Sequence, residues 1–454
     1  MKAGTTTIWG CWKKKTAIVK IALGAFHESA LMIKSILGTF STKLLTALLS
    51  FALIILLSQH LGAEGKGEAS LILTTITIII LFCDFVGGSS LVYLAPRHNL
   101  PSLLAVSYIW AFFISALAYL GLHLYPVLPE PYIIHTVLIA FLQALFCINL
   151  FILLSNEKIR LFNLGRLIQI GICVIVAGSL LYTLDEKSVY AYIIGLYISS
   201  IITFLLSLYW LPKQKNRPDL KAIGIPIRAA FQLGSLNQFA NIAQFLNYRA
   251  SYYILGIYWT SAEIGIYSNS ASIAESVWIF TNSVNLVQYA SIANSDNNLD
   301  NKNLTIGLCK VSFLFTTIPV LILCLLPPGL YKLVFGAEFG DMTYAIRALA
   351  PGILLYNFSK VLSHYFSGTG RYQYNMLGAF SGLLVTIVIG LWLIPSSPLT
   401  GSGLTTSLSY LCSSLVLLGI FLRIEKESFS RFIPDSQDWS LLRKELSPGR
   451  FFKK

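Results

Sequence analysis

The chain has 454 residues, of which 55% are hydrophobic and only 12% are charged, and its mean hydropathy is +0.70. Soluble domains carry about 25% charged residues, so this composition excludes a soluble, secreted or disordered protein. The formal net charge is +13. It does not indicate nucleic-acid binding, because the basic residues lie in short segments between apolar runs and at both ends, which is how membrane proteins encode orientation.

Apolar runs of about 20 residues recur along the chain, and each is long enough to cross roughly 30 Å of hydrocarbon. The sequence therefore predicts an all-α polytopic membrane protein with about twelve transmembrane helices, and not a β-barrel, whose strands would alternate at every second residue. With a cytoplasmic N-terminus, most basic residues fall in cytoplasmic segments, so both termini are predicted to be cytoplasmic. The few lysines left for outer loops are Lys66, Lys187 and Lys332.

The chain divides into two sets of helices joined by a polar linker. The basic segment 1–35 does not resemble a cleaved signal peptide, because Lys20 interrupts its apolar stretch. Two alternatives stay open for it: an interfacial helix, or a translation start at Met32. The predicted boundaries that follow are an N-terminal lobe of helices 1–6 over 36–211, a cytoplasmic linker over 212–227, a C-terminal lobe of helices 7–12 over 228–423, and a basic cytoplasmic tail over 424–454.

The two sets resemble each other in sequence. Leu37 and Leu233 each begin a Leu-Gly pair that precedes a helix, a turn with Ala-Glu and glycine, and a second helix. Because six helices per repeat is an even number, both copies would start on the same side of the membrane. This predicts two six-helix lobes related by a pseudo-two-fold axis along the membrane normal. Chance recurrence of glycine-containing turns is the alternative. A weaker echo, FGAEFG, occurs at residues 335–340.

Polar side chains inside these helices indicate either a wet cavity or helix–helix contacts, because an unsatisfied polar group in hydrocarbon costs several kcal/mol. For scattered hydroxyls such as Thr46 and Ser50 in the first helix, we expect helix packing. The helix around residue 244 is the most polar, and we expect its central stripe to line a cavity. Its candidate substrate-cavity residues are Asn237, Asn241, Gln244, Asn247, Tyr248 and Arg249.

Charged residues within the helices are candidate functional residues, because inserting one near the membrane centre costs roughly 3 kcal/mol. On this ground Lys43 and Lys360 join the candidate cavity, and Glu275 and Asp84 are candidates for gating or ion coupling. A rise of about 1.5 Å per residue from each hairpin turn brings Arg249 level with Glu275, and Lys43 level with Asp84. We therefore predict two hairpin ion pairs, whose alternative role is only to fix helix register.

The sequence lacks the motifs of catalysis and of common cofactors. It contains no GxxxxGK[ST] phosphate-binding loop, no HExxH, no metal-spaced Cys/His cluster and no long outer loop carrying acids. We therefore predict that the protein is not an enzyme, with no catalytic residues, no cofactor and no metal.

Three stretches resemble one family of membrane proteins. They include LSQHLGAEGKGEASLI from Leu57, YRASYYILGIYWTSAEIGIY from Tyr248 and YKLVFGAEFGDMTYAIR from Tyr331. These resemble the polysaccharide-biosynthesis membrane proteins, which are O-antigen and other lipid-linked oligosaccharide flippases. Their superfamily also holds the multidrug and toxin extrusion transporters. The resemblance extends over nearly the whole chain except the first 35 residues.

The resemblance implies a function as well as a fold. It implies that alternating access of two lobes moves an undecaprenyl-diphosphate-linked oligosaccharide, such as an O-antigen unit of lipopolysaccharide, to the outer leaflet of a bacterial cell membrane. Arg249 would be a cavity cation, which the diphosphate would compete for with Glu275, since arginine grips phosphate bidentately. The implied partners are the lipid-linked substrate and membrane lipids, with a polysaccharide polymerase or chain-length machinery as a further candidate and no nucleic acid.

Three other functions are alternatives. A cation-coupled drug or metabolite exporter of the same superfamily would need an acidic, aromatic cavity, whereas the candidate residues here have a basic excess. A membrane glycosyltransferase, polymerase or ligase would need catalytic acids on a long outer loop. The third alternative is a scaffold without transport activity.

Overall fold

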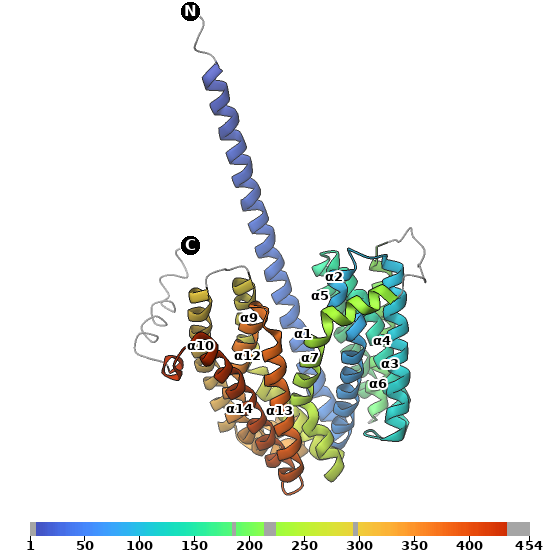
Figure 1. The fold of residues 1–454 in the computed structure, drawn as a ribbon. Coiled ribbons are helices and arrows are strands. Elements are labelled where there is room, and N and C mark those ends of the chain that lie inside the picture. The colour runs from blue at the N-terminus through green and yellow to red at the C-terminus, as the bar shows by residue number, and fades with distance from the viewer. Residues whose placement is uncertain (1–5, 184–187, 213–223, 294–297, 434–454) are drawn as a thin grey trace, which may run out of the picture.

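The computed structural model describes the backbone of residues 6–183, 188–212, 224–293 and 298–433. Side chains are described from residue 41 onward, except for most of 224–237 and a few positions between 280 and 298. Within these ranges the chain forms α-helices and short 3-10 turns and contains no β-strand. Figure 1 shows the helices in two groups, with α3, α4 and α6 in one and α10, α12 and α14 in the other.

The first group, the N-lobe, begins with two helices that meet at a glycine. α1 (Thr6–Gly87) is interrupted at Gly62, whose φ of 67° and ψ of −170° are not helical. A positive φ strains residues with a Cβ, so glycine suits this position. The chain turns back there, and the two halves of α1 account for the first two predicted spans (Figure 1). The rest of the N-lobe consists of α2 (Ser90–Leu94), α3 (Leu100–Leu124), α4 (Glu130–Ser155), α5 (Ile159–Thr183) and α6 (Val189–Trp210).

The second group, the C-lobe, repeats this order of six crossings. Its second crossing is broken at Val277 and Trp278 into α8 and α9, and a short helix and a 3-10 turn precede its fourth crossing. The elements are α7 (Gly224–Tyr258), α8 (Ser261–Ser276), α9 (Ile279–Ala293), α10 (Asn298–Leu325), α11 (Pro328–Phe335), η2 (Ala337–Asp341), α12 (Met342–Gly368), α13 (Tyr372–Leu393), α14 (Pro398–Glu425) and η3 (Phe429–Phe432). The predicted twelve crossings in two lobes are confirmed.

Eight described helices are long and apolar enough to cross a membrane by length and composition alone, with both halves of α1 counted as one. The crossings outside this set are α7, the broken pair α8 and α9, and α12. α7 and α12 are long but carry many polar residues. A polar helix within a membrane bundle faces the interior of the protein or a water-filled space, so these helices are where a polar site is expected.

The two lobes meet tightly at the end of the bundle that contains Gly62 and Thr260, here called the hairpin end. The second half of α1 crosses α8 there at Gly67 and Gly265. A Cβ atom at Gly67 would overlap the carbonyl oxygen of Ser261, and one at Gly265 would overlap the carbonyl oxygen of Ala63. The lobes therefore close backbone against backbone, an approach that only residues without a side chain permit.

The FGAEFG echo reinforces this closure. The Ala63 amide donates to Oε2 of Glu338 over 2.6 Å, and Nε2 of Gln59 donates to the carbonyl oxygen of Val334 over 2.8 Å. These contacts join the end of the first half of α1 and its turn to α11 and η2 in the other lobe. The hairpin end is thus closed by contacts between the lobes in this structure.

Candidate functional site

A polar cavity of about 280 Å³ lies in the C-lobe between α7, α12 and α13. It extends from the aromatic rings of Tyr248 and Tyr356 to Ser367 and Asn375, at the ends of α12 and α13 that lie away from the hairpin end. No acidic residue is among those that line it. We call it the C-lobe cavity, and its polar lining consists of Asn241, Gln244, Tyr248, Tyr356, Ser359, Lys360, Ser363, His364, Ser367 and Asn375.

Lys360 is the cation of this cavity. Its Nζ donates to Oδ1 of Asn282 over 3.1 Å and lies 4.6 Å from the centroid of the Trp278 ring. An ammonium over an indole face is stabilised by the negative face of the ring. Among the described residues, no carboxylate forms an ion pair with Lys360. Its charge is therefore held by an amide and a ring and is available to an anionic ligand.

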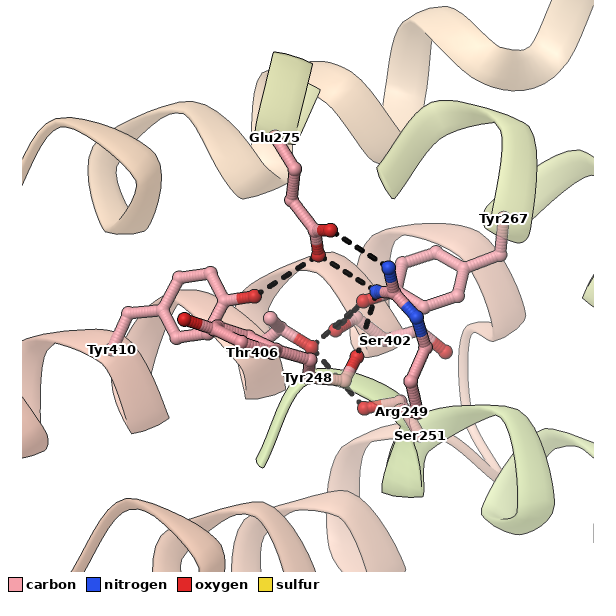
Figure 2. Close-up of polar contacts among 8 residues, drawn as sticks. All are labelled: Tyr248, Arg249, Ser251, Tyr267, Glu275, Ser402, Thr406 and Tyr410. Atoms are coloured by element: carbon pink, nitrogen blue, oxygen red, sulfur yellow. Dashed lines mark hydrogen bonds and ion pairs between the residues drawn. The ribbon is translucent and has the colours of Figure 1, made fainter. Parts of the chain in front are cut away.

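Arg249 and Glu275 form a bidentate ion pair next to the cavity (Figure 2). Nη1 and Nη2 of Arg249 lie 2.8 Å from Oε1 and Oε2 of Glu275, respectively. The hydroxyl of Tyr410 donates to Oε1 of the same carboxylate over 3.3 Å. The Arg249 guanidinium also lies 5.4 Å from the ring centroid of Tyr252. The side chains of the pair are 20% and 17% exposed, and the predicted Arg249–Glu275 pair is confirmed.

An aromatic cluster connects this ion pair to the cavity. The ring of Tyr248 lines the cavity and lies 5.7 Å from the ring of Tyr410, which donates to Glu275. Tyr356 lies 4.4 Å from Tyr410 and accepts a hydrogen bond from Gln244. Aromatic rings packed this closely move together, so a ligand that displaces Tyr248 or Gln244 would disturb the partners of Glu275.

The structure brings together four of the predicted cavity residues, namely Asn241, Gln244, Tyr248 and Lys360. Arg249 and Glu275 lie beside the cavity but do not line it. The side chain of Asn237 lies outside the described residues.

Asn247 differs from its prediction as a cavity residue. It is fully buried, donates to Ser413 and accepts from Thr386 and Ser409. Its amide therefore ties α7 to α13 and α14. Asn247 directly precedes Tyr248, and one residue is a step of about 100° around a helix, so its side chain points away from the stripe of Asn241, Gln244 and Tyr248.

The predicted Lys43–Asp84 pair is wrong for the described residues. Lys43 is exposed on the first half of α1, and no ion pair joins it to Asp84. The half-buried carboxyl of Asp84 instead interacts electrostatically with Arg166 of α5. Equal depth along two helices does not bring side chains together when they point in different directions around the helix axes.

Lys66, which the sequence analysis assigned to an outer loop, is buried between the lobes. Its Nζ donates to Oγ of Ser70 over 2.6 Å and to Oγ of Ser268 over 3.3 Å. It lines a second cavity, which the sequence analysis did not predict. This N-lobe cavity of about 340 Å³ lies between α1, α4, α5 and α6, and its polar lining includes Thr46, Ser50, Gln143, Arg166 and Gln169.

Comparisons with known proteins agree with this architecture. The chain is 24% identical over 403 residues to the capsular polysaccharide biosynthesis protein CapF of Staphylococcus aureus, covering 83% of this chain and 96% of CapF. The structure resembles the lipid II flippase MurJ in an inward closed conformation, with a TM-score of 0.72 and 15% identity, covering 91% of this chain and 96% of MurJ. It also resembles an inward-facing multidrug resistance MATE family transporter of the MOP superfamily, with a TM-score of 0.70 and 13% identity, covering 87% of this chain and 99% of that transporter.

At such identities the structural likeness establishes the fold. Family membership rests on the sequence, because the profile of one family matches residues 104–344, more than half of the chain, across both lobes. The protein is therefore a multi-pass membrane protein that belongs to the polysaccharide biosynthesis protein family.

Proposed function

We propose that this protein flips an undecaprenyl-diphosphate-linked oligosaccharide from the inner to the outer leaflet of a bacterial cell membrane by alternating access. Family membership supports a role in polysaccharide assembly, and the fold it has in common with a lipid II flippase supports movement of a lipid-linked sugar. The solved structures named above are of transporters, which favours transport over catalysis.

In the proposed orientation the protein spans the inner membrane, with the hairpin end on the outer side and both termini in the cytoplasm. The distribution of basic residues supports it, because lysine and arginine are enriched in cytoplasmic segments. In this orientation, the closed contact at Gly67 and Gly265 seals the outer side. The C-lobe cavity then extends toward the cytoplasm at Ser367 and Asn375. The structure would represent an inward state that is ready to receive substrate.

The C-lobe cavity is suited to a diphosphate joined to sugars. Lys360 supplies a charge without a carboxylate partner among the described residues, and lysine is an effective point charge for phosphate. The amides of Asn241 and Gln244 can exchange hydrogen bonds with sugar hydroxyls, while the ring of Tyr248 offers an apolar face. The prenyl chain would stay in the lipid between the lobes.

In this proposal Arg249 acts after the first contact with Lys360. Its guanidinium is held by Glu275, so a diphosphate can reach it only by replacing that carboxylate. Phosphate oxygens match the guanidinium as well as a carboxylate does. Release of Glu275 from Arg249 would free a charge beside the aromatic cluster and favour rearrangement of the lobes. The earlier assignment of Asp84 to gating or ion coupling, and that of polymerase or chain-length partners, stay predictions.

The observation that carries the proposal is a basic cavity without acidic lining in a member of a polysaccharide biosynthesis family. The test is complementation of a flippase-null strain by Lys360→Gln and Lys360→Arg, with the accumulated lipid-linked intermediate measured. We expect Lys360→Gln to accumulate the intermediate and Lys360→Arg to restore most export. Lys332→Gln, which removes an exposed lysine at the hairpin end, is the control. Normal export by Lys360→Gln would contradict the assignment.

The alternative is an exporter of drugs or metabolites, which the structural likeness to a multidrug transporter favours. Cationic drugs require an acidic site, and neither cavity has an acidic lining residue. Expression of the protein in a drug-sensitive strain separates the two: raised resistance without complementation of the flippase-null strain would support the exporter.

A further inference from the structure

The two polar cavities lie in different lobes and are built from different sets of helices. The C-lobe cavity lies between α7, α12 and α13, which are the first, fourth and fifth crossings of that lobe. The N-lobe cavity is lined mainly by the two halves of α1, by α5 and by α6, which are the first, second, fifth and sixth crossings of its lobe, and α4 contributes Gln143. The two cavities have no lining residue in common.

Both cavities are basic. The N-lobe cavity is lined by Lys66 and Arg166 and, like its counterpart, by no acidic residue. Nη2 of Arg166 donates to Sγ of Cys147 over 3.4 Å, which is a weak acceptor. Asp84 interacts with Arg166 electrostatically, but the two form no ion pair among the described residues.

Lys66 forms no ion pair with a carboxylate among the described residues. Its side chain is only 6% exposed, and the described partners of its ammonium are two serine hydroxyls. A buried ammonium without a carboxylate partner is costly, and the half-buried Arg166 adds a second positive charge to the same cavity, so this cavity is suited to an anionic ligand.

The remaining lining indicates what kind of anion fits. The amides of Gln143 and Gln169 and the hydroxyls of Thr46 and Ser50 offer donors and acceptors of the kind that sugar hydroxyls pair with. Leucine and isoleucine side chains form much of the remaining wall and can pack against the C–H face of a sugar ring. The planar guanidinium of Arg166 matches a carboxylate bidentately.

Building on the proposed function, we propose that the N-lobe cavity is a second substrate subsite, which binds a carboxylate-bearing sugar of the oligosaccharide while the diphosphate occupies the C-lobe cavity. The two cavities lie in different lobes and have no lining residue in common, so the second basic cavity suits a second negative charge on the substrate, separate from the diphosphate. The substrate class would then be lipid-linked oligosaccharides that contain an acidic sugar. A neutral glycan would offer Arg166 no carboxylate at the cavity and would bind more weakly.

A pair of synthetic substrates tests this directly. Undecaprenyl diphosphate is joined to a disaccharide of N-acetylglucosamine followed by either glucose or glucuronic acid, so that the two probes differ only in one carboxylate. Binding of each probe is measured with the purified full-length protein in detergent. We expect the wild-type protein to bind the acidic probe about tenfold more tightly, which corresponds to one charge-assisted hydrogen-bonded contact.

Four variants show which residue is responsible for the tighter binding of the acidic probe. Arg166→Gln should bind both probes with the wild-type affinity for the neutral one, and Arg166→Lys should keep part of the preference. Lys360→Gln should weaken both probes by a similar factor, because it acts on the diphosphate. Arg97→Gln removes an exposed charge from the same lobe and should change neither. Binding of the neutral probe by Arg166→Gln also reports that this variant is folded. If Arg166→Gln binds neither probe, the preference that Arg166→Lys shows between the two probes is the test of the subsite.

The outcomes separate this inference from the proposed function. If the wild-type protein binds both probes equally, or if Arg166→Gln and Arg166→Lys both keep the full preference, the second subsite is overturned while lipid-linked oligosaccharide binding stands. If neither probe binds to the wild-type protein, the proposed function fails and the subsite fails with it.

Discussion

Tyr410 and Arg249 share one acceptor, because the hydroxyl of Tyr410 and Nη1 of Arg249 both donate to Oε1 of Glu275. The carboxylate is thus held from two sides, by α7 through the arginine and by α14 through the tyrosine (Figure 2). A group held in this way has one preferred position in the present conformation. A substrate phosphate that replaces it at Arg249 would leave the tyrosine as its remaining hydrogen-bond donor in this cluster.

The ion pair gives the first expectation. Removing one partner leaves the other charge mostly buried and unpaired, so Arg249→Ala and Glu275→Ala should each lower the free energy of unfolding by about 3 kcal/mol, the lower end of the range for buried pairs, because this pair keeps some solvent contact. Replacing both with apolar residues, as in Arg249→Met with Glu275→Leu, should recover most of this loss. Thermal unfolding in detergent measures it, with Arg97→Ala as the control. A double variant as unstable as the sum of the two single variants would contradict the pairing.

The crossing of Gly67 and Gly265 gives the second expectation. Gly67→Ala and Gly265→Ala should prevent the hairpin end from closing, because the added methyl group would overlap a backbone carbonyl in the opposite lobe. Accessibility of a Ser268→Cys probe to a membrane-impermeant maleimide measures the closure. We expect the probe to be protected in the parent and labelled in the alanine variants.

Gly121→Ala and Gly307→Ala are the matched controls for this experiment, because a Cβ atom at either position would have no neighbouring atom within 4 Å. They should leave the Ser268→Cys probe protected. Equal labelling of the Gly67→Ala variant and of these controls would show that the close approach is not what seals this end.

The fold could be predicted from the sequence because its signals are strong and local. Apolar runs separated by basic segments predict the crossings, and the Leu-Gly repeat predicts the two lobes. The Arg249–Glu275 pair could also be predicted, because both residues are in the same hairpin. The number of residues between each of them and the turn sets its depth in the membrane.

The cavities were only partly predictable. The stripe on α7 indicated Asn241, Gln244 and Tyr248, but the direction of Asn247 depends on contacts with α13 and α14, far away in sequence. The N-lobe cavity combines Thr46 and Ser50, which lie one turn apart on the first half of α1 and which we expected to serve helix packing, with single polar residues of other helices, such as Gln143 and Arg166. Lys66 lies shortly after a glycine turn, so in the sequence it looks like a loop residue. Only its contact with Ser268 in the other lobe shows that it is buried.

A surface ion cluster gives an expectation about pH. Glu427 lies 2.6 Å from Nζ of Lys302 and 2.8 Å from Nη1 of Arg431, and these two cations hold the pKa of Glu427 below its ordinary value of 4.5. A lowered pKa in the folded state means that the cluster stabilises the protein fully above about pH 4.5 and loses this contribution as the pH falls through the lower, folded-state pKa.

The corresponding experiment compares wild-type protein with Glu427→Gln. At pH 7 the variant should be less stable by no more than about 1 kcal/mol, because the cluster is at the surface and screened by solvent. This difference should shrink as the pH is lowered below 4.5 and as salt is added. Thermal unfolding across that range measures it, and a difference that grew on acidification would contradict the assignment.

Two asparagines on one helix separate a structural role from a binding role. Asn247 is fully buried and joins α7 to α13 and α14, so Asn247→Ala should lower the free energy of unfolding by about 1 to 3 kcal/mol, because three buried hydroxyls each lose one hydrogen bond. Asn241 is exposed to the C-lobe cavity, and Asn241→Ala should change stability by less than about 0.5 kcal/mol but weaken binding of the lipid-linked probe. Thermal unfolding and probe binding, measured on both variants, distinguish the two roles. The opposite result, with Asn241→Ala unstable and Asn247→Ala stable but unable to bind, would place the substrate on the other side of α7.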